Sequence, residues 1–261
     1  MRVLVCGAAG RMGRQVAQAV AAESDLQLVG LCDLREIPTD HLEDVAPDVA
    51  LGSDLAGVIA ASSPDIMVDF TDAAAGSPNI LTAIDAGVSP VVGTTGFAPN
   101  AIDEIDARAR TAGIGAFIAP NFALGAVMLM RLCKTAAPFF EHVEIIEMHH
   151  DKKIDAPSGT AYQTARGIVD ARGRPAAHVP TAKFTLEGVR GGDHEGVKIH
   201  SVRLPGLVAH QEVIFGDLGQ TLTIRHDSTS RESFMPGVVL AIRKVRSLTG
   251  LVVGLDRLLF C

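Results

Sequence analysis

Aromatic side chains are scarce in this sequence of 261 residues, which contains no tryptophan and a single tyrosine, Tyr162. Proteins that hold single-stranded nucleic acid stack its bases on aromatic rings, so we do not expect a stacking platform. The formal net charge is −7, and an excess of acidic side chains disfavours broad contacts with nucleic acid or anionic membranes. We therefore predict that neither nucleic acid nor a membrane is a partner.

Long hydrophobic stretches are also missing. No run of about 18 apolar residues occurs, so no membrane span is predicted. The short apolar stretch at the start of the sequence stops at glycines and lacks the cleavage pattern of a secretory signal. We therefore predict a cytoplasmic location.

Cysteine is the next scarce residue type. The four cysteines, Cys6, Cys32, Cys133 and Cys261, are far apart in the sequence and form no CxxC pair. This spacing is typical of buried, reduced thiols and not of a disulfide framework or a zinc site. A nucleophilic role for Cys133 is the alternative, but no partner residue for it is evident.

Apolar segments are plentiful but short, and in the first 120 residues they alternate with helical patterns. Met12, Val16 and Val20 recur every four residues, which places them on one face of a helix. The segments that we predict as strands are 3–6, 26–32, 66–70, 90–93 and 115–120. Continuously apolar strands that alternate with helices are typical of a parallel sheet covered on both faces. The sequence therefore predicts an N-terminal doubly wound Rossmann-type α/β domain.

The pattern changes after residue 122. A helix is predicted in 126–140 and a strand in 143–150. Further strand-like segments, separated by glycines, occupy 183–189, 197–204, 210–216 and 220–226. Together these segments predict a second domain of the α+β class with an open mixed sheet.

The domain boundaries follow from this change of pattern. The last helical segment, 236–248, is predicted to pack against the first domain. We therefore place the first domain at 1–121, completed by the helical region 231–261, and the second domain at 122–230.

Three glycines, Gly7, Gly10 and Gly13, stand in the segment GAAGRMG between the first predicted strand and the first predicted helix. A pyrophosphate must approach the backbone at such a turn, where any Cβ blocks it, and the helix N-terminus supplies N–H groups. Asp33 ends the second predicted strand, where a carboxylate can hold ribose hydroxyls. A dinucleotide site is therefore predicted, and a tight turn that only packs is the alternative. The predicted contacts are Gly7, Ala8, Ala9, Gly10, Arg11, Met12 and Asp33.

The charges beside this loop bear on the choice of cofactor. The spacing GxxGxxG, in place of GxGxxG, favours the reductase variants of the fold. Asp33 repels a 2′-phosphate and so favours NADH. Arg35, Arg11 and Arg14 are close enough in sequence to bind a 2′-phosphate, but solvated surface charges explain them as well. We expect both NADH and NADPH to be used, with NADH favoured.

Three further loops, in the segments DFTDA, GTTGF and APNFALG, follow predicted strands of the first domain. Ligands of an open α/β sheet bind beyond the carboxyl ends of its strands, so all three loops are candidates for ligand contacts. Thr71, Thr95 and Asn121 are also good helix N-caps, which is the alternative role. The shared position beside the glycine loop favours the ligand. The predicted contacts are Gly93, Thr94, Thr95, Ala119, Pro120, Asn121 and Phe122.

The segment EMHHDKKIDAPSGTA, residues 147–161, concentrates proton donors directly before a predicted helix. A metal site that uses both His149 and His150 is disfavoured, because adjacent residues of an extended chain point to opposite faces. HExxH is absent as well, and no metal is predicted. A hydrogen-bonded strand end followed by solvated lysines is the structural alternative.

The residues after the histidines favour a binding pocket. Lys153 lies four residues after His149, and Ser158 is a suitable N-cap for the helix that follows. The amides of Gly159 and Thr160 then form an anion cradle, and a nearby lysine strengthens carboxylate binding. A histidine beside them can pass a proton near neutral pH. The segment predicts a pocket for a small acidic substrate that receives a proton and, from a nicotinamide, a hydride.

Five segments occur in order along the chain: GAAGRMG, DFT, GTTGF, APNFALGA and ExHHxxKxDAPSGTA. Together with HDSTSRESFMPG near residue 237, they resemble the 4-hydroxy-tetrahydrodipicolinate reductases, formerly called dihydrodipicolinate reductases. The resemblance implies reduction of hydroxy-tetrahydrodipicolinate to tetrahydrodipicolinate with NADH or NADPH and release of water, in lysine and diaminopimelate biosynthesis. It also implies a homotetramer assembled through the sheet of the second domain.

The resemblance assigns roles by motif position. It implies that His149 donates and accepts a proton and that Lys153 donates one. The positions that it implies for binding the substrate are His150, Lys153, Ser158, Gly159 and Thr160. Leu34 departs from the family pattern, because an arginine often follows the acidic residue when NADP is used. Arg231 is kept as a further candidate.

These roles lead to a mechanistic hypothesis. Hydride passes from nicotinamide C4 to the ring of an unsaturated cyclic imine, while His149 and Lys153 face the nicotinamide and manage the proton. One rival is a different dehydrogenase, acting on aldoses or amino acids, with the same glycine loop; the DAPSGT motif disfavours it. The other is a dinucleotide sensor, which needs a partner-binding element that the sequence does not show.

Overall fold

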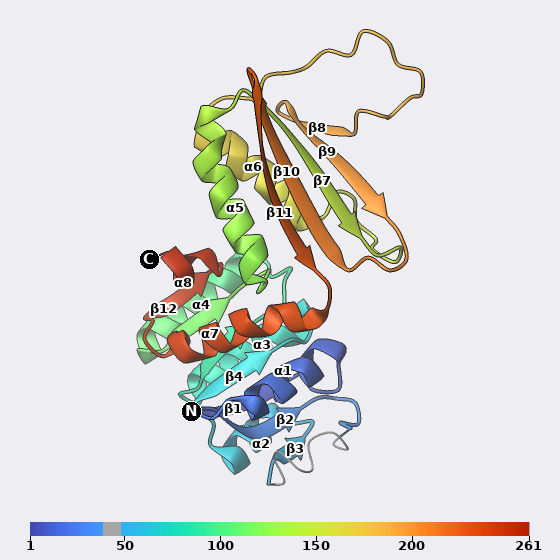
Figure 1. Ribbon diagram of the computed structural model, residues 1–261. Coiled ribbons are helices and arrows are strands. Elements are labelled where there is room, and N and C mark those ends of the chain that lie inside the picture. Colours follow the sequence, from blue (N-terminus) through green and yellow to red (C-terminus); the bar gives the residue numbers. More distant parts are fainter. Residues whose placement is uncertain (39–47, 261) are drawn as a thin grey trace. The chain divides into compact units, whose positions relative to one another are not determined.

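The computed structural model describes residues 1–38 and 48–260 and divides the chain into two units (Figure 1). Unit 1 comprises Met1–Phe122 and Phe234–Cys261, and unit 2 comprises Ala123–Ser233. Each unit contains a sheet and a hydrophobic core of its own.

Unit 1 is built on a parallel sheet with the strand order β12-β6-β5-β4-β1-β2-β3. The strands are β1 (Arg2–Cys6), β2 (Gln27–Cys32), β3 (Ala50–Gly52), β4 (Ile66–Asp69), β5 (Ser89–Val92), β6 (Gly115–Ile118) and β12 (Gly250–Val253). The order reverses between β1 and β4, and this switch point is where open α/β sheets bind ligands. The glycine loop follows β1 directly.

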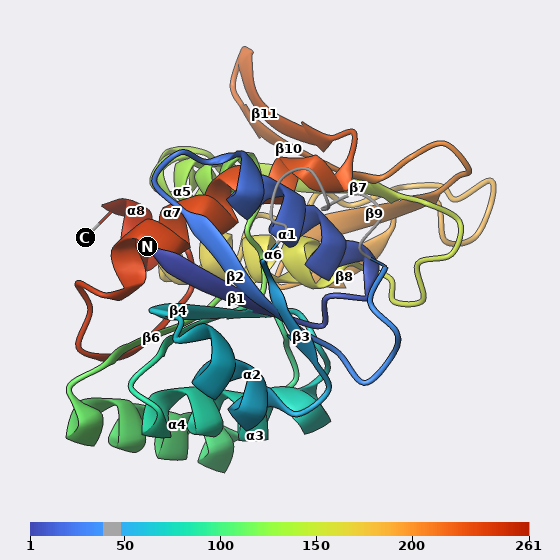
Figure 2. The same ribbon diagram turned by 90° about the horizontal axis from the view of Figure 1, so that it is seen from below.

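Helices cover both faces of this sheet, as Figure 2 shows. One face carries α1 (Arg11–Ala22) and α7 (Met235–Val245), and the other carries α2 (Leu55–Ser62), α3 (Ala73–Asp85) and α4 (Pro99–Ala112). A short helix, α8 (Asp256–Phe260), follows β12. The central strands β4, β5 and β6 are buried over their whole length because both faces are covered. The predicted doubly wound fold is confirmed.

Unit 2 contains a five-stranded sheet in the order β11-β10-β7-β9-β8. The strands are β7 (His142–His149), β8 (Gly192–His194), β9 (Val197–Arg203), β10 (Ala209–Asp217) and β11 (Gln220–Ser228). β7 and β9 run parallel and the other pairs run antiparallel, so the predicted mixed sheet is confirmed. Helices α5 (Leu124–Ala136) and α6 (Gly159–Arg172) cover one face (Figure 1). The core between helices and sheet includes Cys133, Ile145, Ile168, Val213 and Phe215.

Four strands differ from the sequence prediction. The strand predicted in 183–189 is wrong: the chain makes bends and turns there, and Phe184 and Leu186 are 57% and 69% exposed. These apolar residues pair with no strand, because the nearby strand β8 begins only at Gly192. β3, β8 and β12 were not predicted. Each is only three or four residues long, and each lies at an edge of its sheet.

The cysteines behave as predicted where the structure describes them. Cys6, Cys32 and Cys133 are free and buried, while Cys261 lies outside the described residues. Burial raises the pKa of the Cys133 thiol to about 12, so this group is a poor nucleophile near neutral pH. Among the described residues, no helix is both long enough and apolar enough to cross a membrane.

Candidate active site

The loop after β1 is tight because its glycines meet other backbone atoms. Gly7 has a φ of +76°, and a Cβ there would lie 2.8 Å from the carbonyl oxygen of Phe70. A Cβ at Gly13 would collide with the carbonyl of Gly7, which accepts a hydrogen bond from the Gly10 amide at 2.9 Å. Gly10 is the N-cap of α1 and has no side chain to bond the first-turn amides. These amides are therefore well placed for an anion.

Asp33 is fixed beside this loop. Its carboxylate accepts hydrogen bonds from the Ala9 amide at 3.0 Å and from the Arg35 amide at 2.9 Å. The guanidinium of Arg35 also donates to it, from Nε at 3.1 Å. Burial raises the pKa of Asp33, but the hydrogen bonds from Arg35 and Ala9 outweigh burial and lower it. An ionised carboxylate thus stands next to the loop, and Arg35, although 67% exposed, is paired with it.

The loops after β4 and β5 are joined by a buried carboxylate that sequence reasoning missed. Asp69, the last residue of β4, accepts hydrogen bonds from the hydroxyls of Thr71 (2.7 Å) and Thr94 (3.0 Å) and from the Asn79 amide group (2.9 Å). The hydroxyl of Thr94 therefore serves the protein's own structure. A Cβ at Gly93 would strike the ring of Phe70, so this glycine is needed for packing.

The helix-cap alternative for these loops is not supported. The N-caps of α3, α4 and α5 are Asp72, Ala98 and Ala123, and not Thr71, Thr95 or Asn121. Thr95 and Pro120 are exposed and Asn121 is partly exposed.

The remaining residues of the predicted loop after β6 are buried. The amide of Ala119 donates to the carbonyl of Val92 at 2.9 Å. The ring of Phe122 is 2% exposed and packs against Phe70 and Phe117, at centroid distances of 5.7 and 6.0 Å. The aromatic face that the sequence suggested at Phe122 therefore belongs to the core.

In unit 2, the pleat of the sheet places a polar layer at the end of β7. Residues that face each other on β10, β7 and β9 lie on the same face of the sheet. On the covered face an apolar row gives way to a row with a carboxylate and then to a row with a histidine. The three rows are Val213–Ile145–Ile199, Gln211–Glu147–Ser201 and Ala209–His149–Arg203.

Glu147 is the centre of this polar layer, and its side chain has no exposed surface. It lies 2.5 Å from Nδ1 of His149 and accepts two hydrogen bonds from Arg203, at 2.7 and 3.0 Å. The amide of Ser158 donates to it at 3.2 Å. Burial raises the pKa of Glu147, but the hydrogen bonds from His149, Arg203 and Ser201 outweigh it and lower the pKa to about 2. Glu147 is therefore ionised at neutral pH.

Lys153 lies in the turn between β7 and α6. Its amide donates to the carbonyl of His150 at 3.2 Å, and its ammonium group donates to Asp155 at 2.6 Å. The hydrogen bond from Lys153 lowers the pKa of Asp155, and the Gly159 amide contributes in the same direction. The ammonium group of Lys153 thus already pairs with one carboxylate close to the N-terminus of α6, where a negative charge is favoured.

The start of α6 agrees with the sequence prediction. Ser158 is the N-cap, with its hydroxyl accepting from the Ala161 amide at 3.2 Å, and Gly159 is the first helical residue. The hydroxyl of Thr164 donates to the carbonyl of Thr160 at 2.8 Å and accepts from the buried Gln211 side chain, also at 2.8 Å. The other candidate, Arg231, is exposed at the start of the 3₁₀ turn Arg231–Phe234.

The structure brings the predicted residues together in two clusters. The glycine loop, Asp33 and the loops after β4, β5 and β6 share the carboxyl edge of the unit 1 sheet. His149 and the start of α6 meet through Glu147, and Lys153 meets α6 through Asp155. In the part of the chain that the structure describes, no three His, Cys, Asp or Glu side chains are grouped to hold a metal ion.

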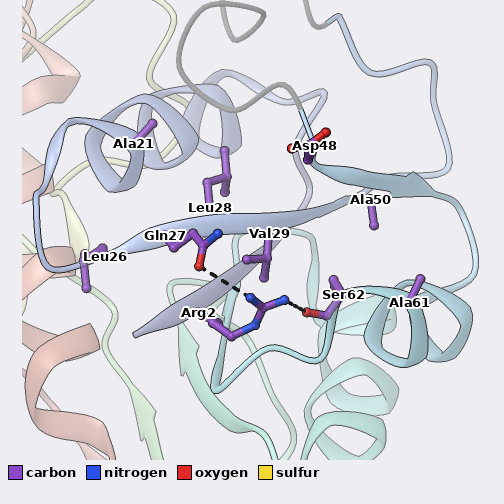
Figure 3. Close-up of a pocket in the computed structure, with 10 residues that line it drawn as sticks. All are labelled: Arg2, Ala21, Leu26, Gln27, Leu28, Val29, Asp48, Ala50, Ala61 and Ser62. Carbon is purple, nitrogen blue, oxygen red and sulfur yellow. Dashed lines mark hydrogen bonds between the residues drawn. The ribbon is translucent and has the colours of Figure 1, made fainter.

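A hollow elsewhere in unit 1 is unrelated to these clusters. It has a volume of about 390 Å³ and lies at the amino ends of β1, β2 and β3, away from the glycine loop (Figure 3). Its polar lining residues are Arg2, Gln27, Asp48 and Ser62. The guanidinium of Arg2 already donates to Gln27 and to the carbonyls of Ser62 and Ser63. The hollow is therefore no candidate for the dinucleotide.

Sequence reasoning missed Arg203 entirely. Apolar and polar residues alternate at the start of 197–203, and Val197 and Ile199 face the core. Because every second residue of a strand lies on the same face, Arg203 shares the face of β9 that carries these two residues. A charged residue that continues a buried face at a strand end indicates a paired or functional charge.

A doubly wound nucleotide-binding unit with a second unit of mixed sheet defines the class of two-domain NAD(P)H-dependent oxidoreductases. The family model "Dihydrodipicolinate reductase, N-terminus" matches residues 1–122, and the model "Dihydrodipicolinate reductase, C-terminus" matches residues 125–259. The chain belongs to the dihydrodipicolinate reductase family.

Individual relatives cover nearly the whole chain. The 4-hydroxy-tetrahydrodipicolinate reductase of Moorella thermoacetica is 51% identical over 99% of this chain and 98% of its own length. That of Dehalococcoides mccartyi (strain BAV1) is 48% identical with the same coverage. A solved structure of dipicolinate-bound dihydrodipicolinate reductase from Paenisporosarcina sp. TG-14 is 40% identical, covers 98% of both chains and superimposes with a TM-score of 0.89.

Proposed function

We propose that this protein catalyses the NADH- or NADPH-dependent reduction of 4-hydroxy-tetrahydrodipicolinate to tetrahydrodipicolinate with release of water. This is a step of lysine and diaminopimelate biosynthesis. The observation that carries the proposal is the ionised, buried Glu147 bonded to His149 at the end of β7, in a chain whose two halves both match the family. Relatives at 48–51% identity over 99% of the chain carry the same activity in their names.

The cofactor binds to unit 1 in this proposal. The fit of the site rests on the Gly7–Gly13 turn, where a Cβ would meet backbone atoms, and on the ionised Asp33 beside it. The dinucleotide supplies a hydride when bound. The residues that would hold it, in addition to Asp33, are Gly7, Ala8, Ala9, Gly10, Arg11, Met12, Gly93, Thr95, Ala119, Pro120 and Asn121. Thr94 and Phe122 would contribute only backbone atoms, because the hydroxyl of Thr94 bonds Asp69 and the ring of Phe122 is buried. The pairing of Asp33 with Arg35 supports use of both cofactors, because Arg35 is exposed and can turn to a 2′-phosphate.

His149 is the proposed site of proton exchange. An ionised carboxylate only accepts hydrogen bonds, so Nδ1 of His149 must carry a proton to bond Glu147. The other ring nitrogen, Nε2, is then the atom that takes up or releases the proton of the reaction. Lys153 is the proposed second proton donor, four residues further along the chain.

The substrate binds to unit 2 in this proposal. His150, Lys153, Ser158, Gly159 and Thr160 are the proposed contacts of its two carboxylates. Support comes from Asp155, a carboxylate that Lys153 and the Gly159 amide already bind. The dipicolinate in the related solved structure is a dicarboxylate as well.

Assembly as a homotetramer in the cytoplasm completes the proposal. The helices α5 and α6 cover one face of the unit 2 sheet, and side chains of its other face, such as Ile146, Val202 and Ile214, are only partly buried. A second copy of this sheet is the proposed cover. Light scattering coupled to size-exclusion chromatography is expected to give four times the mass of the 27.3 kDa chain.

The decisive experiment mixes the protein with freshly prepared 4-hydroxy-tetrahydrodipicolinate and follows the loss of NADH or NADPH absorbance. We expect rapid turnover, and a Lys153→Ala variant is expected to lose about 10²- to 10⁴-fold in turnover because a positioned proton donor is lost. Aldoses and amino acids serve as alternative substrates. Turnover of one of these but not of the cyclic substrate would contradict the proposal.

A further inference from the structure

We infer that Arg203 is a positioning residue that holds the His149 imidazole and the segment bearing Lys153 in one fixed geometry. This inference deepens the proposed function and rests on the proton-transfer roles of His149 and Lys153. No segment of the sequence motif contains Arg203, which lies 50 residues after Lys153.

The position of Arg203 follows from the parallel pairing of β7 and β9. His149 and Arg203 are the last residues of the two strands and face each other in the register. Their side chains lie on the covered face of the sheet, and that of Arg203 is only 20% exposed. The guanidinium is therefore delivered to the point where β7 turns toward α6.

One planar group then contacts two segments. Both terminal nitrogens of Arg203 bind Glu147, at 3.0 and 2.7 Å, and Glu147 in turn binds Nδ1 of His149 at 2.5 Å. The nitrogen Nη2 also donates to the backbone carbonyl of Asp155 at 2.8 Å. Asp155 is two residues after Lys153 and binds its ammonium group. Arg203 is thus connected to His149 through the carboxylate of Glu147 and to Lys153 through Asp155.

The chemistry of the guanidinium matters for this connection. Its fork of N–H groups has a fixed planar geometry, so bonding both oxygens of Glu147 fixes the direction in which the remaining N–H points. A lysine at this position keeps the positive charge but has no fixed fork. Arg203→Lys therefore keeps the positive charge at this position but removes the planar fork of N–H donors.

A matched pair of variants tests the inference. Arg174 forms a similar two-pronged contact with Glu141, at 3.0 and 2.5 Å, but is 55% exposed and lies beyond the opposite end of β7. Arg203→Lys is expected to lower kcat on the order of 10- to 100-fold with little change in the KM values, because small misplacements of catalytic groups have effects of this size. Arg174→Lys is expected to leave kcat and KM unchanged.

Two further measurements separate positioning from other roles. Crystal structures of both variants are expected to show the His149 ring and residues 150–158 displaced relative to each other in Arg203→Lys and unchanged in Arg174→Lys. In Arg203→Ala, millimolar guanidinium is expected to restore part of kcat, while ammonium at equal concentration is not.

Several results would overturn the inference. A raised substrate KM with normal kcat in Arg203→Lys would make Arg203 a substrate contact, and a lowered unfolding temperature with normal kcat would make it a structural residue only. An unchanged geometry in the Arg203→Lys crystal structure would equally overturn it. If the wild-type protein fails to reduce the cyclic substrate, the proposed function fails, and the two crystal structures still decide whether Arg203 positions these segments.

Discussion

Two glutamates on β7, Glu147 and Glu144, have the same kinds of partners on opposite faces of one sheet. Glu144 binds His200 at 2.8 Å and Arg190 at 2.5 Å, and its side chain is 32% exposed. Glu147 binds His149 and Arg203 with no exposed surface. Burial raises and hydrogen bonds lower the pKa of both; the net effect lowers each, and the pKa of Glu147 falls to about 2.

The comparison shows that residue type alone does not decide how firmly a carboxylate fixes its histidine. A backbone amide at the start of α6 adds a third kind of donor to Glu147, and helices α5 and α6 exclude water from that face. In low dielectric the same hydrogen bonds fix geometry more firmly than at a solvated surface. The covered face thus holds a histidine fixed by a buried carboxylate, and the other face holds an ion pair that is partly exposed in the single chain.

The largest expected difference between the two faces is in activity. His149→Gln is expected to reduce turnover by about 10²- to 10⁴-fold, because the proposed proton-exchanging group is lost. His200→Gln, its counterpart beside Glu144, is expected to change turnover by no more than about twofold, because His200 is not among the residues proposed to bind substrate or exchange a proton. Steady-state kinetics on variants with unchanged assembly measure both. Equal losses in the two variants would contradict the distinction between the faces.

The second difference concerns stability. Glu147→Ala leaves the Arg203 charge without its partner on the covered face, and such losses cost about 3–5 kcal/mol. Glu144→Ala removes a partly solvated pair and is expected to cost about 1 kcal/mol or less. Urea unfolding at neutral pH, followed by circular dichroism, gives both values. Similar unfolding midpoints would show that burial of Glu147 does not strengthen its interactions.

The third difference depends on pH. The pKa of Glu147 is lowered from its ordinary value to about 2 in the folded protein, so its ionised form favours folding above the unfolded-state pKa. This contribution is lost as the pH falls from about 5 toward 2. The gap in unfolding midpoint between wild type and Glu147→Gln is therefore expected to narrow over this range. Glu144→Gln is expected to show a smaller gap at every pH, and a gap that widens on acidification would refute the assignment.

The smallest expected effect concerns Asp155, which binds the donors proposed for the substrate. Asp155→Asn removes a negative charge that competes with a dicarboxylate for Lys153 and the Gly159 amide. We expect the substrate KM to fall about two- to fivefold, in line with the modest strength of exposed ion pairs. Binding of dipicolinate, measured by calorimetry, is expected to tighten by the same factor. A weaker dipicolinate affinity would mean that Asp155 holds Lys153 in its binding position.

The parts of the fold that sequence predicts well are those in which local pattern and tertiary environment agree. The strands of unit 1 are apolar throughout because both faces are covered, and GAAGRMG marks the turn by steric need alone. The segment 183–189 misled because apolar residues also occur on exposed loops. β3 and β12 were not predicted because edge strands of three or four residues are too short to show a hydrophobic periodicity.

The candidate site follows the same rule: residues within one local motif can be predicted from sequence, and residues joined only by the fold cannot. His149, Lys153 and Ser158 stand within ten residues, so a local motif contains them. Arg203 and Asp69 act through partners that are distant in sequence or buried in the sheet edge, and only strand pairing reveals them. The roles suggested for Thr94 and Phe122 depended on which way their side chains point, which local sequence does not state.

The parallel pairing of β7 and β9 also has a consequence for how this family can diverge. The long connection between them is anchored by Ala177, whose amide donates to the Glu141 carbonyl, and again by Arg190 on Glu144. Residues 178–189 between these anchors form no strand or helix. Insertions in that stretch are therefore expected to leave strand register untouched, which makes it a suitable place for an epitope or fluorescent label.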